Sequence, residues 1–212
     1  MINIHKKENI LIIVSVLVWG LVACGNNGVE NKNTEFTQGT EEIIEIETET
    51  EFEIEIVDAE DILLKTWSTY KSEERFKIMG GHFSSAVIGL PAKYDLVQSE
   101  DLVQIYCFPE SRLSIVDDAA TMIDLFNAAR FTVGVYHVTD IESIQGIADD
   151  MKKQIIENEW HGEKPEKLCI IKVDEQYMVS IYGRETFVNV FKQKLESIYS
   201  KMTEVMVEEK LF

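Results

Sequence analysis

Basic residues are scarce in this sequence, and their scarcity sets the first limit on function. The 212 residues include 20 Lys and Arg against 38 Asp and Glu, which gives a net charge of −18. No stretch offers the row of Lys and Arg that a protein needs to neutralise a phosphate backbone. Binding to nucleic acid is therefore not expected.

Signatures of catalysis and of cofactor binding are missing as well. The sequence has no phosphate-binding glycine loop, no dinucleotide fingerprint, no zinc-ligand spacing and no nucleophile elbow. We expect no cofactor and no bound metal, and we assign no catalytic residue from the sequence. No internal repeat is visible, and the length suits one ordinary domain with additional segments.

Only one long apolar run is present, and it lies near the N-terminus. It covers Ile10 to Ala23 and follows Lys6 and Lys7. Fourteen helical residues span about 21 Å, short of the roughly 30 Å bilayer core, so a secretory signal peptide fits better than a membrane span. No second apolar run of about 18 residues follows it.

The apolar run ends in Leu21-Val22-Ala23-Cys24-Gly25, which resembles a bacterial lipobox. This pattern predicts a signal peptide over residues 1–23, cleavage before Cys24 and lipid on that cysteine. Two acyl chains at roughly 0.8 kcal/mol per buried CH₂ make a stable anchor. We therefore expect a protein anchored by lipid to the extracytoplasmic face of the cell membrane. The alternative is an ordinary signal peptide with an incidental cysteine.

Residues 24–60 form a polar and then strongly acidic segment, in which Glu35 to Asp61 carries 12 acidic residues and no Lys or Arg. From Ile44 to Ile56 apolar residues or Thr alternate with Glu, a period typical of a half-buried strand. Six Glu on one face would lie about 7 Å apart and repel one another, which favours an extended tether. For this alternating segment an extended tether, an edge strand and a row of cation-binding Glu residues are all left as interpretations.

Residues 61–210 are predicted to form an α+β domain, preceded by the start of a helix over Ala59 to Tyr70. From Ile62 onward the chain has 24 acidic and 17 basic residues, a net charge of −7. Ser99 is a candidate N-cap for a short helix, and Asp118 to Asn127 reads either as a second short helix or as an irregular run. Arg130 to Val138 is rich in β-branched and aromatic residues and predicts a strand.

The second half of this domain gives clearer signals. Thr139 and Glu142 have the spacing of a capping box for a helix with Ile144, Ala148, Met151 and Ile155 on one face. Two strands then flank Asp174-Glu175 as a hairpin, and a last helix runs from about Glu185 to Met202. The order strand–helix–strand–strand–helix predicts a small antiparallel or mixed sheet with helices packed on one face.

Residues 90–199 resemble a clostridial-type lipoprotein family that shares a domain of unknown function (number 4358). The resemblance depends on the order of features rather than on one motif. These features are Leu90-Pro91, Ser99-Glu100-Asp101-Leu102, Tyr106, Ala128-Ala129, the strand FTVGVYHV, the helix IESIQGIADDMKKQIIENEW and the pair KLCIIKV and QYMVSIYG. The resemblance implies a lipoprotein architecture and no particular chemistry.

Several residues could still support chemistry. His82 lies in a Gly-rich turn beside Ser84 and Ser85, but a hydrolase there would need a partner carboxylate and an oxyanion hole. Cys107 is the sharpest candidate nucleophile, in combination with one of the histidines. A small buried apolar side chain is the competing interpretation of Cys107.

The remaining candidates have mainly structural interpretations. His137 is expected at a strand end, and the His161-x-Glu163 pair lacks a third metal ligand. Cys169 is expected to be buried, and a disulfide between Cys107 and Cys169 is left open. The adjacent pairs Asp117-Asp118 and Asp149-Asp150 are expected on the solvated surface, because neighbouring helix residues do not face each other.

From these observations we expect a non-catalytic binding or accessory module, held to the membrane through lipid on Cys24. Its partner would be an envelope protein or a small ligand. The first alternative is an extracytoplasmic hydrolase that uses Cys107, Ser84 or Ser85. The second is a cation-responsive envelope protein that uses the Glu45–Glu55 row.

Overall fold

The structure is a computed structural model, and it describes residues 54–212. The predicted signal peptide, Cys24 and most of the alternating acidic segment lie outside these residues. Residues 54–58 have no regular secondary structure and lead directly into the first helix. Ile56, the last alternating apolar residue, packs against the hydrophobic core.

An antiparallel sheet of eight strands forms the centre of the described part of the chain. The strand order is β2-β1-β4-β5-β7-β6-β8, and β3 pairs with β4 beside β1. The predicted α+β class is therefore confirmed. The strands are β1 Ile78–Gly80, β2 Val87–Ile88, β3 Ala92–Lys93, β4 Val116–Asp124, β5 Phe131–Val138, β6 Lys167–Val173, β7 Tyr177–Gly183 and β8 Thr203–Lys210.

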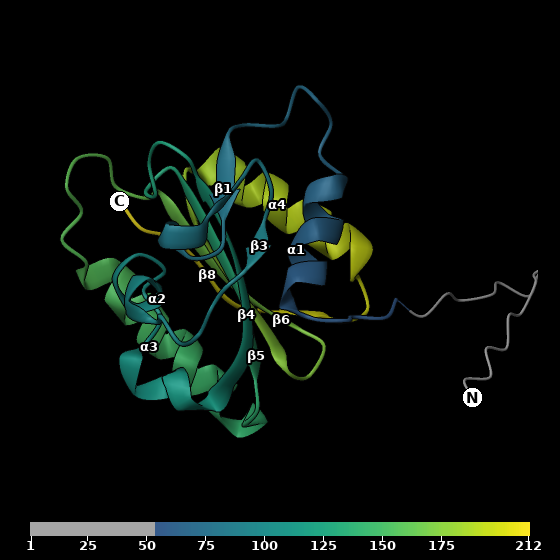
Figure 1. The fold of residues 1–212 in the computed structure, drawn as a ribbon, viewed down its shortest axis with the longest axis vertical. Helices are drawn as coiled ribbons and strands as arrows, with labels where there is room; N and C mark the ends of the chain where they lie inside the picture. Colours follow the sequence, from purple (N-terminus) through teal and green to yellow (C-terminus); the bar gives the residue numbers. More distant parts are fainter. Residues whose placement is uncertain (1–53) are drawn as a thin grey trace, which may run out of the picture. The chain divides into compact units, whose positions relative to one another are not determined.

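Helices cover both faces of this sheet, as Figure 1 shows. One core contains side chains of α1 and α4, and the other contains side chains of α2 and α3. The expectation that all helices pack on one face is therefore wrong. The helices are α1 Ala59–Ser68, α2 Glu100–Gln104, α3 Ile144–Glu157 and α4 Glu185–Ile198, with 3₁₀ turns η1 Phe83–Ser85, η2 Glu110–Ile115 and η3 Ile141–Ser143.

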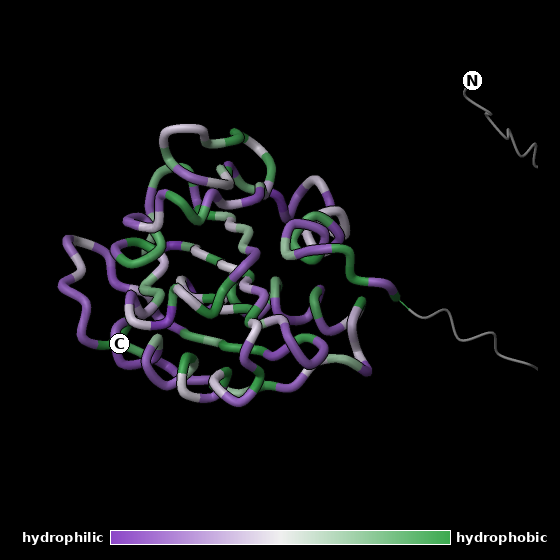
Figure 2. The backbone as a smooth tube through the Cα atoms, turned by 60° about the horizontal axis from the view of Figure 1, so that its bottom comes forward, coloured by the Kyte–Doolittle hydropathy of each residue, from purple (hydrophilic) through white to green (hydrophobic). Residues whose placement is uncertain are grey.

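The side-chain pattern of β6 explains why both faces are covered. Cys169, Ile171 and Val173 enter the core beneath α1 and α4, whereas Leu168 and Ile170 enter the core beneath α3. Successive strand residues point to opposite faces, so an almost continuous apolar run requires a cover on each side. In Figure 2 the helices alternate between hydrophobic and hydrophilic residues, as amphipathic covers must.

Five strands escaped the sequence analysis: the short β1, β2 and β3, of two or three residues each, and the longer β4 and β8. Asp118 to Asn127 was expected to be a helix or an irregular run, but Val116–Asp124 is strand β4 and pairs with β5, β1 and β3. Its interior residues are almost all buried. Such a strand lacks the alternation that identifies a half-exposed one. The other longer strand, β8, was not predicted at all and pairs with β6 at the edge of the sheet.

The helix starts differ in part from the predicted caps. Asp58 caps α1, since its Oδ1 accepts the Asp61 amide at 2.9 Å. The capping box at Thr139 and Glu142 is wrong, because η3 intervenes and α3 begins only at Ile144. The Thr139 hydroxyl instead donates to the Ile115 carbonyl at 3.1 Å. Ser99 precedes α2 without a side-chain capping bond.

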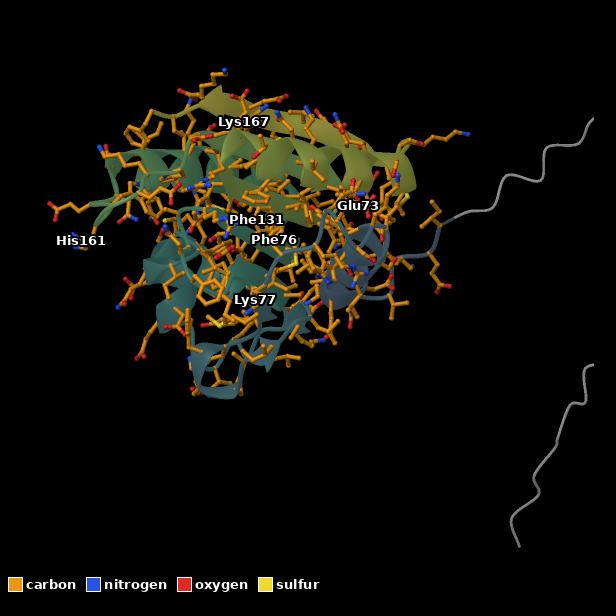
Figure 3. The ribbon with its side chains drawn as sticks, turned by 90° about the horizontal axis from the view of Figure 1, so that it is seen from above. Glu73, Phe76, Lys77, Phe131, His161 and Lys167 are labelled. Atoms are coloured by element: carbon orange, nitrogen blue, oxygen red, sulfur yellow. The ribbon has the colours of Figure 1, made fainter. Side chains whose placement is uncertain are left out.

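An aromatic cluster closes one end of the core under α4. Phe76 and Phe131 lie together in the interior in Figure 3, with ring centroids 5.2 Å apart. The guanidinium of Arg130 lies 4.9 Å from the Phe187 ring centroid and pairs with the buried Asp124 carboxylate at 3.2 Å. Asp124 can stay buried because the backbone amides of Phe126 and Asn127 also donate to its carboxylate, while the Arg130 side chain remains 32% exposed.

Gly183, at the end of β7, provides a test of this packing. It has φ +148°. A Cβ at this position would lie 2.3 Å from the carbonyl oxygen of Arg130, the residue that precedes β5. We expect Gly183→Ala to lower the free energy of unfolding by about 1–3 kcal/mol, measured by urea denaturation. Gly162→Ala is the control, since its Cβ would meet nothing within 4 Å. Equal losses for the two variants would show that the contact with β5 is unimportant.

Candidate functional site

His82, Ser84 and Asp101 form a connected set of side chains at the N-terminal end of α2. His82 precedes η1, and its Nδ1 lies 2.7 Å from Ser84 Oγ. Its other ring nitrogen, Nε2, lies 3.2 Å from Asp101 Oδ2. The sequence placed His82 and Ser84 in one turn, and the fold adds the carboxylate.

The hydrogen bonds around His82 fix its tautomer. The Ser84 backbone amide donates to Nδ1 at 3.2 Å, so Nδ1 carries a lone pair rather than a hydrogen. The hydrogen is therefore on Nε2 and is donated to Asp101. With this tautomer the Ser84 hydroxyl can donate to Nδ1 as well, sharing its lone pair with the Ser84 amide, and a serine hydroxyl beside a histidine lone pair is the arrangement of a nucleophile and its general base.

This set is partly covered by neighbouring residues. The His82 side chain is only 11% exposed, and its ring lies edge-on to Tyr94 with centroids 5.7 Å apart. The Tyr94 hydroxyl donates to the Gln98 carbonyl, which fixes that ring. Asp101 also accepts the Phe83 amide at 3.4 Å, so it ties the turn to α2. Ser84 itself is exposed, as is Ser85.

A cleft of about 730 Å³ lies between α2 and the C-terminal end of α3. One wall consists of Val103, Gln104 and Cys107. The other consists of Gln154, Glu157, Asn158, Glu159, Trp160 and His161. Its volume falls in the range of small-ligand sites, and its side chains combine one aromatic ring with carboxamides and carboxylates.

Cys107 lines this cleft in a strained conformation with an inaccessible thiol. Its φ is +53°, which side-chain-bearing residues seldom adopt, and the residue is 3% exposed. The Tyr182 hydroxyl donates to the Ile105 carbonyl and holds the adjoining backbone. Burial raises the pKa of the Cys107 thiol to about 12, so the thiol is protonated at neutral pH and is a poor nucleophile.

The two described cysteines lie in different cores. Cys107 belongs to the core under α2 and α3, and Cys169 belongs to the core under α1 and α4. Both are buried and free. Because the sheet separates them, the disulfide that the sequence left open does not form in this fold.

His161 and Trp160 follow α3 and reach the cleft from its outer rim. The Trp160 indole donates to the Ile155 carbonyl at 3.1 Å, and its ring packs on Tyr182. Figure 3 shows His161 at the outer end of its loop, away from the body of the domain. Glu163 pairs with Arg184 at 2.6 Å rather than acting with His161.

The other candidates are engaged in separate contacts. His137 Nδ1 lies 2.5 Å from Asp117, and its ring packs on Tyr177. Asp118 accepts the Ala59 amide and pairs with Lys93 at 2.9 Å. Asp149 and Asp150 also have different partners. Asp149 accepts a hydrogen bond from Gln145, and Asp150 accepts one from Arg112. These carboxylates stabilise the fold and do not converge on one point.

Within residues 54–212, no three His, Cys, Asp or Glu side chains gather in a way that would hold a metal ion. In the same part of the chain no helix has the length and apolarity to cross a membrane. The chain matches no known protein family, no curated protein and no solved structure. The candidate sites are therefore assigned from their geometry.

Asp101 and Tyr94 are the members of the His82 set that sequence reasoning missed. They lie beyond the turn in the chain, and only the packing of α2 beside η1 brings them to His82. A signal was present for Asp101, which stands in the first turn of a helix predicted from Ser99. An acidic residue there is usually explained by the helix dipole.

The protonated state of Cys107 can be tested with a thiol reagent. With the pKa raised to about 12, only about one Cys107 in ten thousand is a thiolate at pH 8. We expect 5,5′-dithiobis(2-nitrobenzoate) to leave Cys107 and Cys169 unmodified in the native protein and to modify both in 6 M guanidinium. Rapid native modification that Cys107→Ala removes would contradict this and favour the cysteine hydrolase.

Proposed function

We propose that this protein is a lipid-anchored extracytoplasmic lipoprotein whose domain binds a small polar ligand in the cleft between α2 and α3. The observation that carries the proposal is the cleft, which places Trp160 among the carboxamides of Gln104, Gln154 and Asn158. An aromatic face combined with groups that both donate and accept hydrogen bonds suits a ligand that carries hydroxyl and amide groups.

The backbone around the cleft supports a preformed site. Tyr182 fixes the Ile105 carbonyl beside Cys107, and the Trp160 indole is bonded to the Ile155 carbonyl in the last turns of α3. Each wall is therefore tied to the domain by a partly buried hydrogen bond, including the loop after α3 that carries Trp160. A preformed site loses less conformational entropy when a ligand binds.

At this cleft we propose binding without catalysis. Cys107 is the only thiol or hydroxyl side chain among the residues that line the cleft, and burial raises the pKa of its thiol. Glu157 and Glu159 line the cleft together with Trp160 and give the rim a negative charge. The rim would therefore disfavour anionic ligands and accept neutral or cationic ones.

The anchor rests on the lipobox at Cys24 and on the polar segment that separates it from the domain. Residues 24–55 would reach on the order of 100 Å if fully extended, at about 3.3 Å per residue, since Ile56 already packs against the core of the domain. Nothing in the cleft requires the membrane, so we expect anchoring and binding to be separable.

Cys24 labelling tests the anchor. We expect cells grown with an alkyne-bearing palmitate analogue to label the wild-type protein and not Cys24→Ala, as read by in-gel fluorescence. Cys107→Ala and Cys169→Ala are matched controls that keep the label, because both thiols are buried in the fold. Label that persists in Cys24→Ala would refute the lipoprotein assignment.

Tryptophan fluorescence tests the cleft. Trp67 is buried in the opposite core at 3% exposure, so Trp67→Phe leaves Trp160 as the reporter in a chain cleaved before Cys24. We expect N,N′,N″-triacetylchitotriose, which carries hydroxyl and amide groups, to change this emission at millimolar concentration. The change should weaken at least threefold in Gln154→Ala, for the loss of about 1 kcal/mol of hydrogen bonding. An unchanged spectrum would argue against this ligand class.

A further inference from the structure

We propose that Ser84, His82 and Asp101 form a hydrolytic site for esters with an apolar acyl group. This goes beyond the binding function of the cleft and does not depend on it. The two sites share α2, since Asp101 lies in its first turn whereas Gln104 and Cys107 line the cleft at its other end.

Each residue has a distinct role that its contacts define. Ser84 is the nucleophile, because its hydroxyl donates to His82 Nδ1 at 2.7 Å. His82 is the general base, because its Nδ1 lone pair faces that hydroxyl while Nε2–H is held by Asp101 at 3.2 Å. Asp101 is a positioning residue that acts through His82 and stabilises the positive charge formed on it.

The reaction balances with water as the only co-reactant. Ser84 Oγ forms a bond to the ester carbonyl carbon, and its proton passes to His82 Nδ1. The carbon–oxygen bond to the alcohol breaks, and the departing oxygen takes that proton. Water then attacks the acyl-Ser84, gives its proton to Nδ1 and releases a carboxylic acid, and Ser84 regains its proton.

The surface beside Ser84 indicates the acyl group. No charged residue occurs from Ile78 to Ala92, in a chain whose net charge is −18. Within this stretch Phe83, Val87, Ile88 and Leu90 are all exposed, and Ile88 is 64% exposed. Exposed apolar side chains in a charge-free segment favour contact with an aliphatic or aromatic acyl group over a charged one.

The competing interpretation is that His82 only caps the 3₁₀ turn. The Ser84 amide does donate to Nδ1, but at 3.2 Å, whereas the Ser84 hydroxyl lies closer at 2.7 Å. A turn cap also needs no carboxylate on the far side of the ring. Asp101 and the edge of Tyr94 hold the imidazole in one orientation, which is what a general base requires.

The experiment uses the full-length protein in detergent with a fluorophosphonate–biotin probe, followed by peptide mass spectrometry, and with p-nitrophenyl butyrate as substrate. We expect the probe on Ser84 and ester hydrolysis above the buffer rate. Ser84→Ala should lose both, with a fall of about 100-fold or to background. Ser85→Ala is the matched control and should keep both. Ser85 contacts His82 only through its backbone amide, which donates to the His82 carbonyl at 2.9 Å and which the substitution keeps.

Asp101 has its own test. Asp101→Asn should reduce labelling about tenfold or more, and Asp101→Glu should restore part of it, while the circular dichroism spectrum of each variant stays that of the wild type. Absence of probe on Ser84, or equal losses in Ser84→Ala and Ser85→Ala, would overturn the proposal.

Discussion

Burial of both faces of the sheet is the constraint on which the rest of the domain depends. The central strands β5, β6 and β7 have almost no exposed residue, so each side chain must fit one of two cores. α1 and α4 supply one cover, and α2 and α3 supply the other. The hydrophobic surface buried in this way favours folding by about 25 cal/mol per Å², and removing either cover would expose a full sheet face.

This constraint also decides where chemistry is possible. An unpaired polar side chain inside either core would cost several kcal/mol. The functional candidates therefore lie at the two ends of α2 and at the C-terminal end of α3. α2 is short, and both the His82 set and the cleft use it because it stands at the boundary between the core and the surface loops. The buried Leu102 anchors this helix while Asp101 and Gln104, on either side, reach outward.

The sequence predicted the α+β class, β5, the β6–β7 hairpin and the long helices, because their periods are regular and their turns are marked. It missed β4, where Ala119, Ala120 and Met122 have helical propensity and only pairing with β5 and β1 makes a strand. It missed β8 because Glu204, Glu208 and Glu209 obscure the alternation of apolar and polar residues. In the fold, ion pairs of Lys167 and Lys192 with Glu208 stabilise this strand at the edge of the sheet. The near-continuous apolar run in β6 is typical of a strand that is covered on both faces, and so it indicated a second layer of helices.

The candidate sites show a different limit. Local sequence places His82 and Ser84 in one turn, and the turn itself determines the tautomer, since the Ser84 amide occupies Nδ1 and leaves the hydrogen on Nε2. In this orientation Nδ1, which can accept a proton, faces Ser84, and the Nε2–H group points away from the turn. Only the fold can supply an acceptor for Nε2–H. Asp101 occupies that position because Leu102 buries α2 against the sheet. Cys107, three residues beyond the end of α2, is buried in the same core as Leu102, and its own burial raises the pKa of its thiol to about 12. The placement of one short helix therefore affects both nucleophile candidates that the sequence left open.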